Sequence, residues 1–337
     1  MITAVKATMG TMHRGQQKMR KFSSASVVIA MMMVVGCTVH HHHHHGDSTA
    51  AESTSEGAVP PAERVPPGHQ ESPPVQHEQG AAVSIDSRGW TERFALGQED
   101  FGCELDADDE LVCWGEDRPL TTDLPPGPFV EIDLHFSHGC ALTPESEVVC
   151  WGENDSGQLN SPSGRFVQVQ ASTRYSCALD EQGAVHCWGD DDAGRTSPPG
   201  GQFTRISLGN MHGCGIRSDG DAQCWGLYDD RVSGPFVDIG AGLAHSCGLR
   251  EDGQIQCWGS NTFDKTESPG GLFEQLALGE NTTCAIDNRG EAICWGWGFD
   301  TGRVLDGAVH ALVVGGGQIC GLYDHGEVSC QRIIQRD

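Results

Sequence analysis

Alternating apolar and polar residues, interrupted by short polar turns, run through most of the chain. In the stretch Cys177–Gly189, with the sequence CALDEQGAVHCWG, two alternating runs flank a polar centre. Folding this stretch symmetrically places Asp180 opposite Ala184 and leaves a three-residue loop that ends in Gly183. Loops of this length usually combine a type I turn with one left-handed residue, a conformation that glycine adopts readily. The pattern predicts a β-hairpin whose two cysteines form a non-hydrogen-bonded pair, with Cα atoms roughly 4.5 Å apart.

This hairpin pattern occurs seven times, always with nine residues between its two cysteines. Successive first cysteines are 37, 37, 37, 33, 37 and 36 residues apart, and a regular period of this length indicates a repeat architecture. The last loop position is glycine in five repeats, whereas Asp109 and Ser146 occupy it in the first two. The cysteine pairs are Cys103 with Cys113, Cys140 with Cys150, Cys177 with Cys187, Cys214 with Cys224, Cys247 with Cys257, Cys284 with Cys294, and Cys320 with Cys330.

A further strand-like run precedes most of the hairpins, for example FVEIDL from Phe129 and FVQVQA from Phe166. Similar runs begin at Phe203, Phe236 and Phe273. Each repeat therefore consists of about three strands and a loop. Seven small all-β units of nearly equal size indicate a closed ring of blades, which is a seven-bladed β-propeller with one cysteine-linked hairpin in each blade.

The second repeat contains the fragments Cys140-Ala141-Leu142, Cys150-Trp151-Gly152 and Gly157-Gln158-Leu159. Through these fragments the repeat resembles that of the regulator of chromosome condensation family, and the likeness covers residues 81–337. The resemblance implies seven blades and a blade that both ends of the chain share. The last repeat lacks a segment after its second cysteine, and we expect the alternating Val83 and Ile85 to supply the missing strand.

The chain begins with a segment that is typical of an exported bacterial protein. Five Lys or Arg residues and no acidic residue occur in the first 36 positions, before the apolar run Val27–Val35. This run is too short for a membrane-spanning helix but suits a signal peptide. Val34-Val35-Gly36-Cys37 resembles a bacterial lipobox, which implies removal of residues 1–36 and lipidation of Cys37. An ordinary cleaved signal, in which Cys37 is incidental, is the alternative, and Met19 is an alternative start of the chain.

An exported chain enters an oxidising compartment, in which disulfides persist. Seven hairpin pairs and Cys37 account for the fifteen cysteines of the sequence. The competing interpretation is metal binding, but nine intervening residues are not the spacing of zinc ligands. We therefore expect one disulfide in each blade, and each stabilises the fold by at most about 2–3 kcal/mol.

Residues 37–80 have the composition of a disordered tether between the lipid anchor and the propeller at residues 81–337, because they are rich in Pro, Ser, Glu and Gly. The tract His40, His41, His42, His43, His44 and His45 is either a purification tag or a weak site for a transition metal. The formal net charge of −26 argues against nucleic acid as a partner, since phosphate contacts dominate such binding. Thr38 after the lipidated cysteine favours the outer membrane over the inner membrane.

Recognised catalytic motifs are absent from the sequence, which has no Gly-rich phosphate loop, no H-E-x-x-H and no nucleophile elbow. His138, His212 and His245 recur two residues before a cysteine, so we interpret them as structural parts of the repeat. Acidic loops such as Asp190-Asp191-Asp192 are compatible with calcium, but they do not match a calcium-loop pattern and suit ordinary turns. We predict no catalytic residue and no cofactor.

The candidate binding residues are aromatic side chains in the loops that follow the Trp-Gly pairs, because exposed aromatics anchor interfaces. They are Tyr228, Phe263, Trp297 and Phe299. Trp297 is the leading candidate, since no other repeat has a tryptophan at that place.

These features predict a monomeric, lipid-anchored module of the bacterial cell envelope, periplasmic or surface-exposed, that binds another protein. Binding of glycan or cell wall is the alternative, and it requires aromatic platforms that recur in each blade. An enzyme with its site in the central channel requires carboxylates or histidines that converge there. Members of the resembling family act as nuclear nucleotide exchange factors or inhibit β-lactamases. An acidic chain with a signal and no inserted segment between repeats argues against the exchange activity. Loops before the first cysteines that are poorer in aromatics argue against β-lactamase inhibition.

Overall fold

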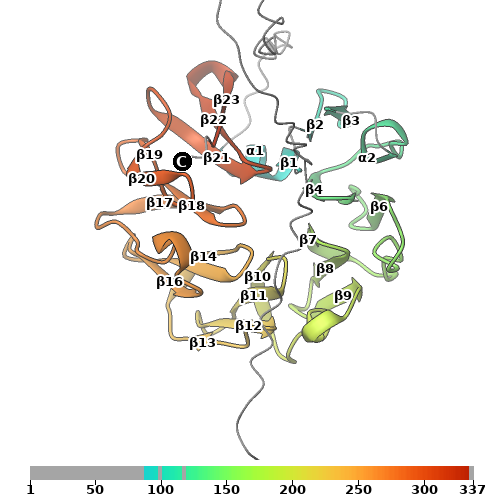
Figure 1. Ribbon diagram of the computed structural model, residues 1–337. Helices are drawn as coiled ribbons and strands as arrows, with labels where there is room; N and C mark the ends of the chain where they lie inside the picture. Colours follow the sequence, from blue (N-terminus) through green and yellow to red (C-terminus); the bar gives the residue numbers. More distant parts are fainter. Residues whose placement is uncertain (1–86, 98–100, 116–118, 334–337) are drawn as a thin grey trace, which may run out of the picture. The chain divides into compact units, whose positions relative to one another are not determined.

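The computed structural model describes residues 87–97, 101–115 and 119–333, which form seven consecutive antiparallel sheets arranged around a ring (Figure 1). We call these sheets blades 1 to 7 in chain order. The predicted all-β, seven-bladed fold is therefore confirmed. The predicted signal peptide, Cys37, the tether with its histidine tract and the strand at Val83 and Ile85 lie outside the described residues. No helix in the described ranges is long and apolar enough to cross a membrane.

Each blade begins with its inner strand, which lies nearest the centre of the ring and is followed by a hairpin. The first three blades are β1 (Phe94–Leu96), β2 (Gly102–Leu105) and β3 (Leu111–Trp114); β4 (Glu131–His135), β5 (His138–Leu142) and β6 (Val148–Gly152); and β7 (Phe166–Ser172), β8 (Tyr175–Asp180) and β9 (Val185–Gly189). Blade 4 contains β10 (Phe203–Leu208), β11 (His212–Arg217), β12 (Ala222–Gly226) and the short β13 (Arg231–Val232).

The last three blades follow the same order. Blade 5 contains β14 (Phe236–Ala241), β15 (His245–Arg250) and β16 (Ile255–Gly259); blade 6 contains β17 (Phe273–Leu278), β18 (Thr282–Asp287), β19 (Ala292–Gly296) and β20 (Phe299–Arg303); and blade 7 contains β21 (Val309–Gly315), β22 (Gln318–Tyr323) and β23 (Val328–Arg332). The short helices are α1 (Ser87–Arg93), α2 (Pro119–Thr122), η1 (Asp192–Gly194), η2 (Thr262–Asp264) and η3 (Asp324–Gly326).

The register of the hairpins agrees with the sequence prediction. Cys177 lies opposite Cys187, and the Asp180 N–H donates to the Ala184 carbonyl at 2.9 Å across a loop in which Gly183 has a φ of 83°. At the same loop position, Asp109 and Ser146 also have positive φ angles of 62° and 67°, so the turn keeps its geometry without glycine.

All seven predicted disulfides are present, one in each blade. Their Cα–Cα distances of 3.9–4.1 Å are slightly shorter than expected. The bonded pairs are Cys103 with Cys113, Cys140 with Cys150, Cys177 with Cys187, Cys214 with Cys224, Cys247 with Cys257, Cys284 with Cys294, and Cys320 with Cys330.

The second cysteines of these pairs differ in burial, whereas the first cysteine is 0% exposed in every blade. Cys224 and Cys294 are buried, since β13 and β20 add a fourth strand to their blades. In blades of three strands, Cys113 and Cys257 are half-buried and Cys330 is exposed. The outer end of a disulfide is therefore covered only where a fourth strand follows the hairpin.

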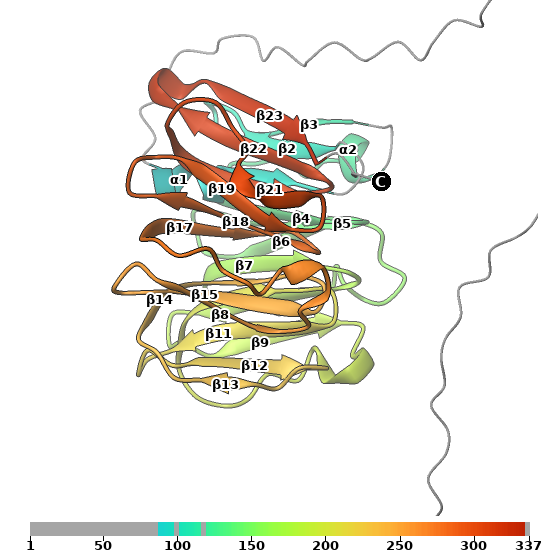
Figure 2. The same cartoon turned by 60° about the vertical axis from the view of Figure 1, so that its left-hand side comes forward.

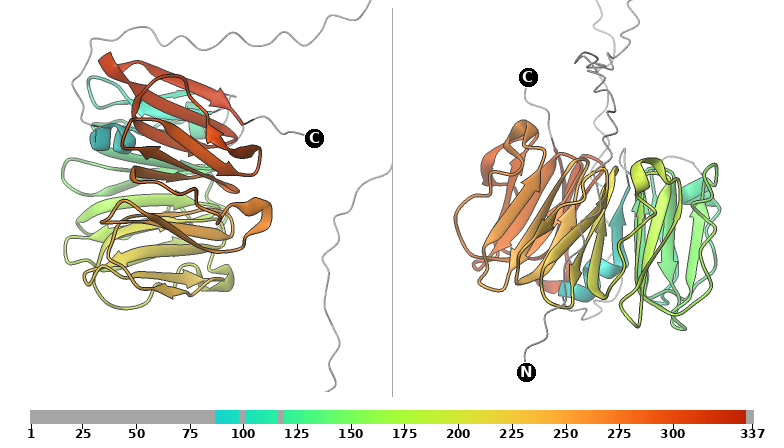
Figure 3. Two further views of the ribbon diagram at one scale, coloured as in Figure 1. Left: turned by 90° about the vertical axis from the view of Figure 1, so that its left-hand side faces the viewer. Right: turned by 90° about the horizontal axis from the view of Figure 1, so that it is seen from below.

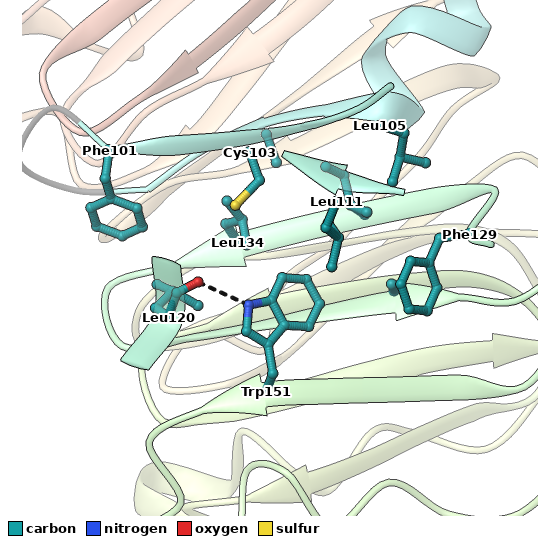
Figure 4. Close-up of a cluster of buried hydrophobic side chains, with 11 residues drawn as sticks. Phe101, Cys103, Leu105, Leu111, Leu120, Phe129, Leu134 and Trp151 are labelled. Atoms are coloured by element: carbon teal, nitrogen blue, oxygen red, sulfur yellow. Dashed lines mark hydrogen bonds between the residues drawn. The ribbon is translucent and has the colours of Figure 1, made fainter. Parts of the chain in front are cut away.

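The hydrophobic core lies between neighbouring blades rather than within one sheet. Figure 4 shows Leu105 and Leu111 of blade 1 facing Phe129 and Trp151 of blade 2. Comparable clusters join blades 2 and 3, 3 and 4, 4 and 5, 5 and 6, and 6 and 7. Neighbouring blades thus shield both faces of each sheet from water. A blade of three strands has no core of its own and depends on this packing.

Packing of α1 and β1 against blade 7 closes the ring. Trp90, Phe94 and Leu96 form one buried cluster with Ala311 and Leu322, and the rings of Trp90 and Phe94 stack at 4.7 Å. Within the described residues, the strands of blade 7 all come from the last repeat and those of blade 1 all come from the first. The predicted shared blade depends on Val83 and Ile85, outside these residues.

One end of the ring carries two sets of segments, and we call this end the loop face (Figures 2 and 3). The first set joins each inner strand to its hairpin, and the second follows each third strand. Backbone hydrogen bonds connect the two sets, such as Leu227 N–H to the Met211 carbonyl at 3.1 Å. The hairpin loops and the starts of the inner strands occupy the opposite end, the hairpin face.

Candidate functional site

On the loop face, tryptophans after the second cysteines tie blades 2, 3, 4 and 6 to the blade before them. In four blade pairs the indole N–H donates to a backbone carbonyl of the segment that follows the preceding third strand. The donor and acceptor residues are Trp151 and Leu120 (3.0 Å; Figure 4), Trp188 and Gln158 (2.7 Å), Trp225 and Arg195 (2.9 Å), and Trp295 and Lys265 (3.0 Å). These bonds hold the turns of blades 2, 3 and 5 over the next blade.

The side chains of two accepting residues are themselves buried and paired. Arg195 is 6% exposed, forms an ion pair with Asp190 at 2.8 Å and lies over the Tyr175 ring at 5.3 Å. Lys265 is 2% exposed and donates to Asn281 Oδ1 at 2.7 Å, and burial lowers the pKa of its ammonium. The cations therefore help to fix these turns.

The three recurrent histidines connect neighbouring blades through hydroxyl groups. Nε2 lies within hydrogen-bonding distance of a Ser or Thr hydroxyl of the next blade. The pairs are His138 and Ser176 (2.7 Å), His212 and Ser246 (2.6 Å), and His245 and Thr283 (2.8 Å). Burial lowers the pKa of the three imidazoles to about 3, 4 and 3, respectively. This geometry supports the structural role that their recurrence predicts.

The four candidate binding residues differ in exposure. Phe263, in the turn of blade 5, is 53% exposed. Tyr228 is half-buried and meets the His212 ring edge to face at 5.3 Å. Trp297 is half-buried, and its backbone N–H donates to the Asn281 carbonyl at 2.9 Å. Phe299 begins β20 and packs against the cluster between blades 6 and 7.

Three exposed apolar residues of the loop face escaped the sequence analysis. Phe136 and Met211 belong to segments before the hairpins, whereas Leu227 directly follows a Trp-Gly pair. Their exposed fractions are 45%, 39% and 48%. The sequence signal that could have identified them is the position of each residue in a loop between two predicted strands.

At the centre of the ring, side chains of one blade bind the backbone edge of the next. Each inner strand is the edge strand of its sheet, so no further strand pairs with it on the channel side. Buried N–H groups at such an edge need another acceptor. Glu131 Oε1 accepts from the Val169 N–H at 3.0 Å, and Gln168 Oε1 accepts from the Ile206 N–H at 2.9 Å. Further contacts of this kind join Asp133 to Ala171 (2.7 Å), Ser207 to Ala241 (3.0 Å) and Gln275 to Leu312 (3.0 Å).

The inner strands line a cavity of about 350 Å³. Burial raises the pKa of Glu131 to about 8 and that of Asp133 to about 7, although hydrogen bonds from the backbone oppose this. Burial also lowers the pKa of His135. Carboxylates and a histidine thus converge in the channel, as an enzyme would require, but the backbone of the next blade engages both carboxylates. No group of three or more His, Cys, Asp or Glu residues suited to a metal ion occurs in the described part of the chain.

The order of strands within each blade and the core between the blades define the class of this protein, a seven-bladed β-propeller. Residues 136–158, 166–195 and 236–264, which belong to blades 2, 3 and 5, match the regulator of chromosome condensation (RCC1) repeat, so the propeller contains RCC1 repeats. No match was found among curated protein sequences.

Solved structures share the fold at low sequence identity. The ectodomain of the receptor kinase CR4 from Physcomitrella patens is 24% identical, with a TM-score of 0.62, over 71% of this chain and 72% of that one. The ectodomain of ACR4 from Arabidopsis thaliana is 22% identical, with a TM-score of 0.62, over 72% and 95%. Prp20p from Saccharomyces cerevisiae is 18% identical, with a TM-score of 0.56, over 67% and 80%.

Proposed function

We propose that this propeller is a protein-binding module, held at the bacterial envelope by a lipid on Cys37, and that the loop face is its recognition surface. Exposed apolar side chains of the loop face carry this proposal. Phe136, Met211, Leu227 and Phe263 are 39–53% exposed there. Phenylalanine and methionine are enriched at protein interfaces. The exposed apolar residues of the hairpin face, such as Val167 and Leu272, are aliphatic.

The fold and the charge of the chain support the same function. Yeast RCC1, a structural neighbour with a TM-score of 0.56, was crystallised bound to Kap60, which shows that a propeller of this type binds another protein. The net charge of −26 favours a basic partner, because complementary charges increase the rate of encounter. Disulfides in every blade suit an oxidising compartment outside the cytoplasm.

A capture experiment tests the recognition surface. The full chain with Cys37→Ser, oxidised and immobilised, is incubated with an envelope extract of its own organism, and bound proteins are identified by mass spectrometry. We expect one stoichiometric protein, which Phe136→Ser combined with Phe263→Ser should release. The matched control combines Val167→Ser with Leu272→Ser on the hairpin face, where the two side chains are 53% and 52% exposed.

If the double variant of Phe136 and Phe263 still binds the captured protein, the loop face is rejected as the recognition surface. If the control variant loses the captured protein, the hairpin face is the recognition surface instead. Capture of polysaccharide instead of protein would favour the glycan alternative.

The anchor has a separate test. Mass spectrometry of the mature N-terminus should find a lipid-modified Cys37, and an unmodified cysteine there would reject the lipoprotein assignment.

A further inference from the structure

Blade 4 lacks the turn that blades 2, 3 and 5 place over the next blade. The carbonyls that accept the tryptophan N–H groups belong to Gln158, Arg195 and Lys265, each eight residues before the phenylalanine that begins the next inner strand. Tyr228 holds this place in blade 4. It follows Trp225 by three residues instead of seven, which explains the short spacing of 33 residues between Cys214 and Cys247.

The short turn leaves Trp258 of blade 5 without its partner. The Trp258 Nε1–H is buried and has no hydrogen-bond acceptor in the described residues. Its equivalent Trp225 is 3% exposed and Trp295 is 1% exposed, whereas Trp258 is only half-buried. Gly259, the next residue, is exposed, although the equivalent Gly296 is buried. A buried donor without an acceptor is less stable than a satisfied one, so an acceptor at this place would be favourable.

Apolar and acidic residues follow the Trp-Gly pair of blade 4, where blades 2, 3 and 5 have the turn. Leu227 is 48% exposed, and the Tyr228 ring packs against His212 of its own blade. Asp229 and Asp230 follow immediately and are both exposed. We call Leu227, Tyr228, Trp258 and Gly259 the short-turn patch. It combines an unused donor with an exposed apolar side chain, and the acidic Asp229 and Asp230 follow Tyr228 in the chain.

We propose that the short-turn patch binds a basic turn of a partner protein, which takes the place of the turn that blade 4 lacks. A backbone carbonyl of the partner accepts the Trp258 indole N–H, as the Arg195 and Lys265 carbonyls do for their own tryptophans. Because water does not reach this N–H, the partner must displace a side chain at the edge of the patch to make the bond. Lysine or arginine beside that carbonyl then pairs with Asp229 and Asp230. This inference rests on the proposed function and names one site on the recognition surface.

A synthetic peptide tests the inference without knowledge of the natural partner. The peptide copies Gly259–Ser268, which includes the turn over Trp295, and carries Asp264→Lys and Glu267→Lys to make it basic. It is titrated into the oxidised full chain with Cys37→Ser, and the indole N–H resonances are followed by NMR. The resonance that Trp258→Phe removes should shift downfield and saturate, while those of Trp225 and Trp295 stay in place.

A graft provides the matched variant. Replacing Leu227-Tyr228 by the residues of Ser260–Lys265 restores the 37-residue spacing, so an internal carbonyl should occupy the Trp258 donor. The graft should shift the Trp258 resonance without peptide and weaken peptide binding at least tenfold. The unmodified acidic peptide should bind more weakly than the basic one.

An unmoved Trp258 resonance, or equal affinity for the graft and the parent, would overturn the inference. Because the capture experiment changes Phe136 and Phe263 and leaves the short-turn patch intact, the two proposals fail separately. Protein capture with no peptide binding would leave the recognition surface in place and reject the patch.

Discussion

Replacing Trp225 and Trp258 separately by phenylalanine distinguishes the hydrogen bond of the indole from its packing. Both changes remove the same atoms, but only the Trp225 N–H has an acceptor, the Arg195 carbonyl at 2.9 Å. Trp225→Phe leaves this carbonyl unpaired in a residue that is 6% exposed, which costs about 1–3 kcal/mol in addition to lost packing. Trp258→Phe removes a donor that is already unpaired. We therefore expect the free energy of unfolding to fall by about 2 kcal/mol more for Trp225→Phe.

Guanidinium-induced unfolding of the oxidised chains measures this difference, and thermal unfolding should separate the two variants by about 4–8 °C at 2–4 °C per kcal/mol. Trp225 is also more deeply buried than Trp258, so a second pair of variants controls for packing. Benzothienylalanine keeps the size of tryptophan but replaces its N–H by sulfur, and it should destabilise the protein at position 225 and not at position 258. Equal losses at the two positions in this second pair would refute the hydrogen-bond argument.

Three further predictions concern charge and covalent structure. The folded-state pKa of Glu131 is raised from 4.5 to about 8, so the native protein keeps a proton that the unfolded chain releases, and this residue lowers stability as pH rises from 4.5 to 8. Glu131→Gln should therefore become more stable than the parent by roughly 1–3 kcal/mol over this range in thermal unfolding, and a constant difference would contradict the assignment. The pKa of His212 is lowered from 6.5 to about 4, so the unfolded chain binds the proton first and stability falls as pH drops from 6.5 to 4. His212→Gln should lose less stability than the parent over that interval, and an identical acid profile would refute a neutral imidazole. Removal of one hairpin disulfide by Cys214→Ala with Cys224→Ala should lower the free energy of unfolding by about 2–3 kcal/mol in denaturant titrations, whereas no change would reject stabilisation by the disulfide.

The elements inside one repeat could be predicted from the sequence, because their determinants are local. The nine-residue spacing of Cys177 and Cys187, with Gly183 between them, defines both the register and the turn of the hairpin. The same spacing in each repeat predicts the number of blades. Because the strand pairing within a hairpin depends on a few neighbouring residues, the structure has little freedom to differ from the prediction.

The contacts between blades were not predictable in this way. Glu131 and Gln168 fit an alternating strand equally well as solvent-exposed residues, and only the position of the next blade gives them backbone donors 38 residues away. The exposure of Leu227 and Trp258 likewise depends on a turn that is missing between them. Of the four aromatic candidates, Phe263 is exposed because it protrudes from a complete turn, whereas Phe299 was expected in a loop and starts a strand.

Closure of the ring, which within the described residues rests on the packing of α1 and β1 against blade 7, has a mechanical consequence. Every disulfide in the described blades links the two strands of one hairpin, so none of them joins blade 1 to blade 7. A force transmitted through Ser87 acts on α1, which lies at the contact between these two blades through Trp90 and Phe94. Under tension from an anchored N-terminus, the ring should therefore open at this contact, while each blade keeps its covalently linked hairpin.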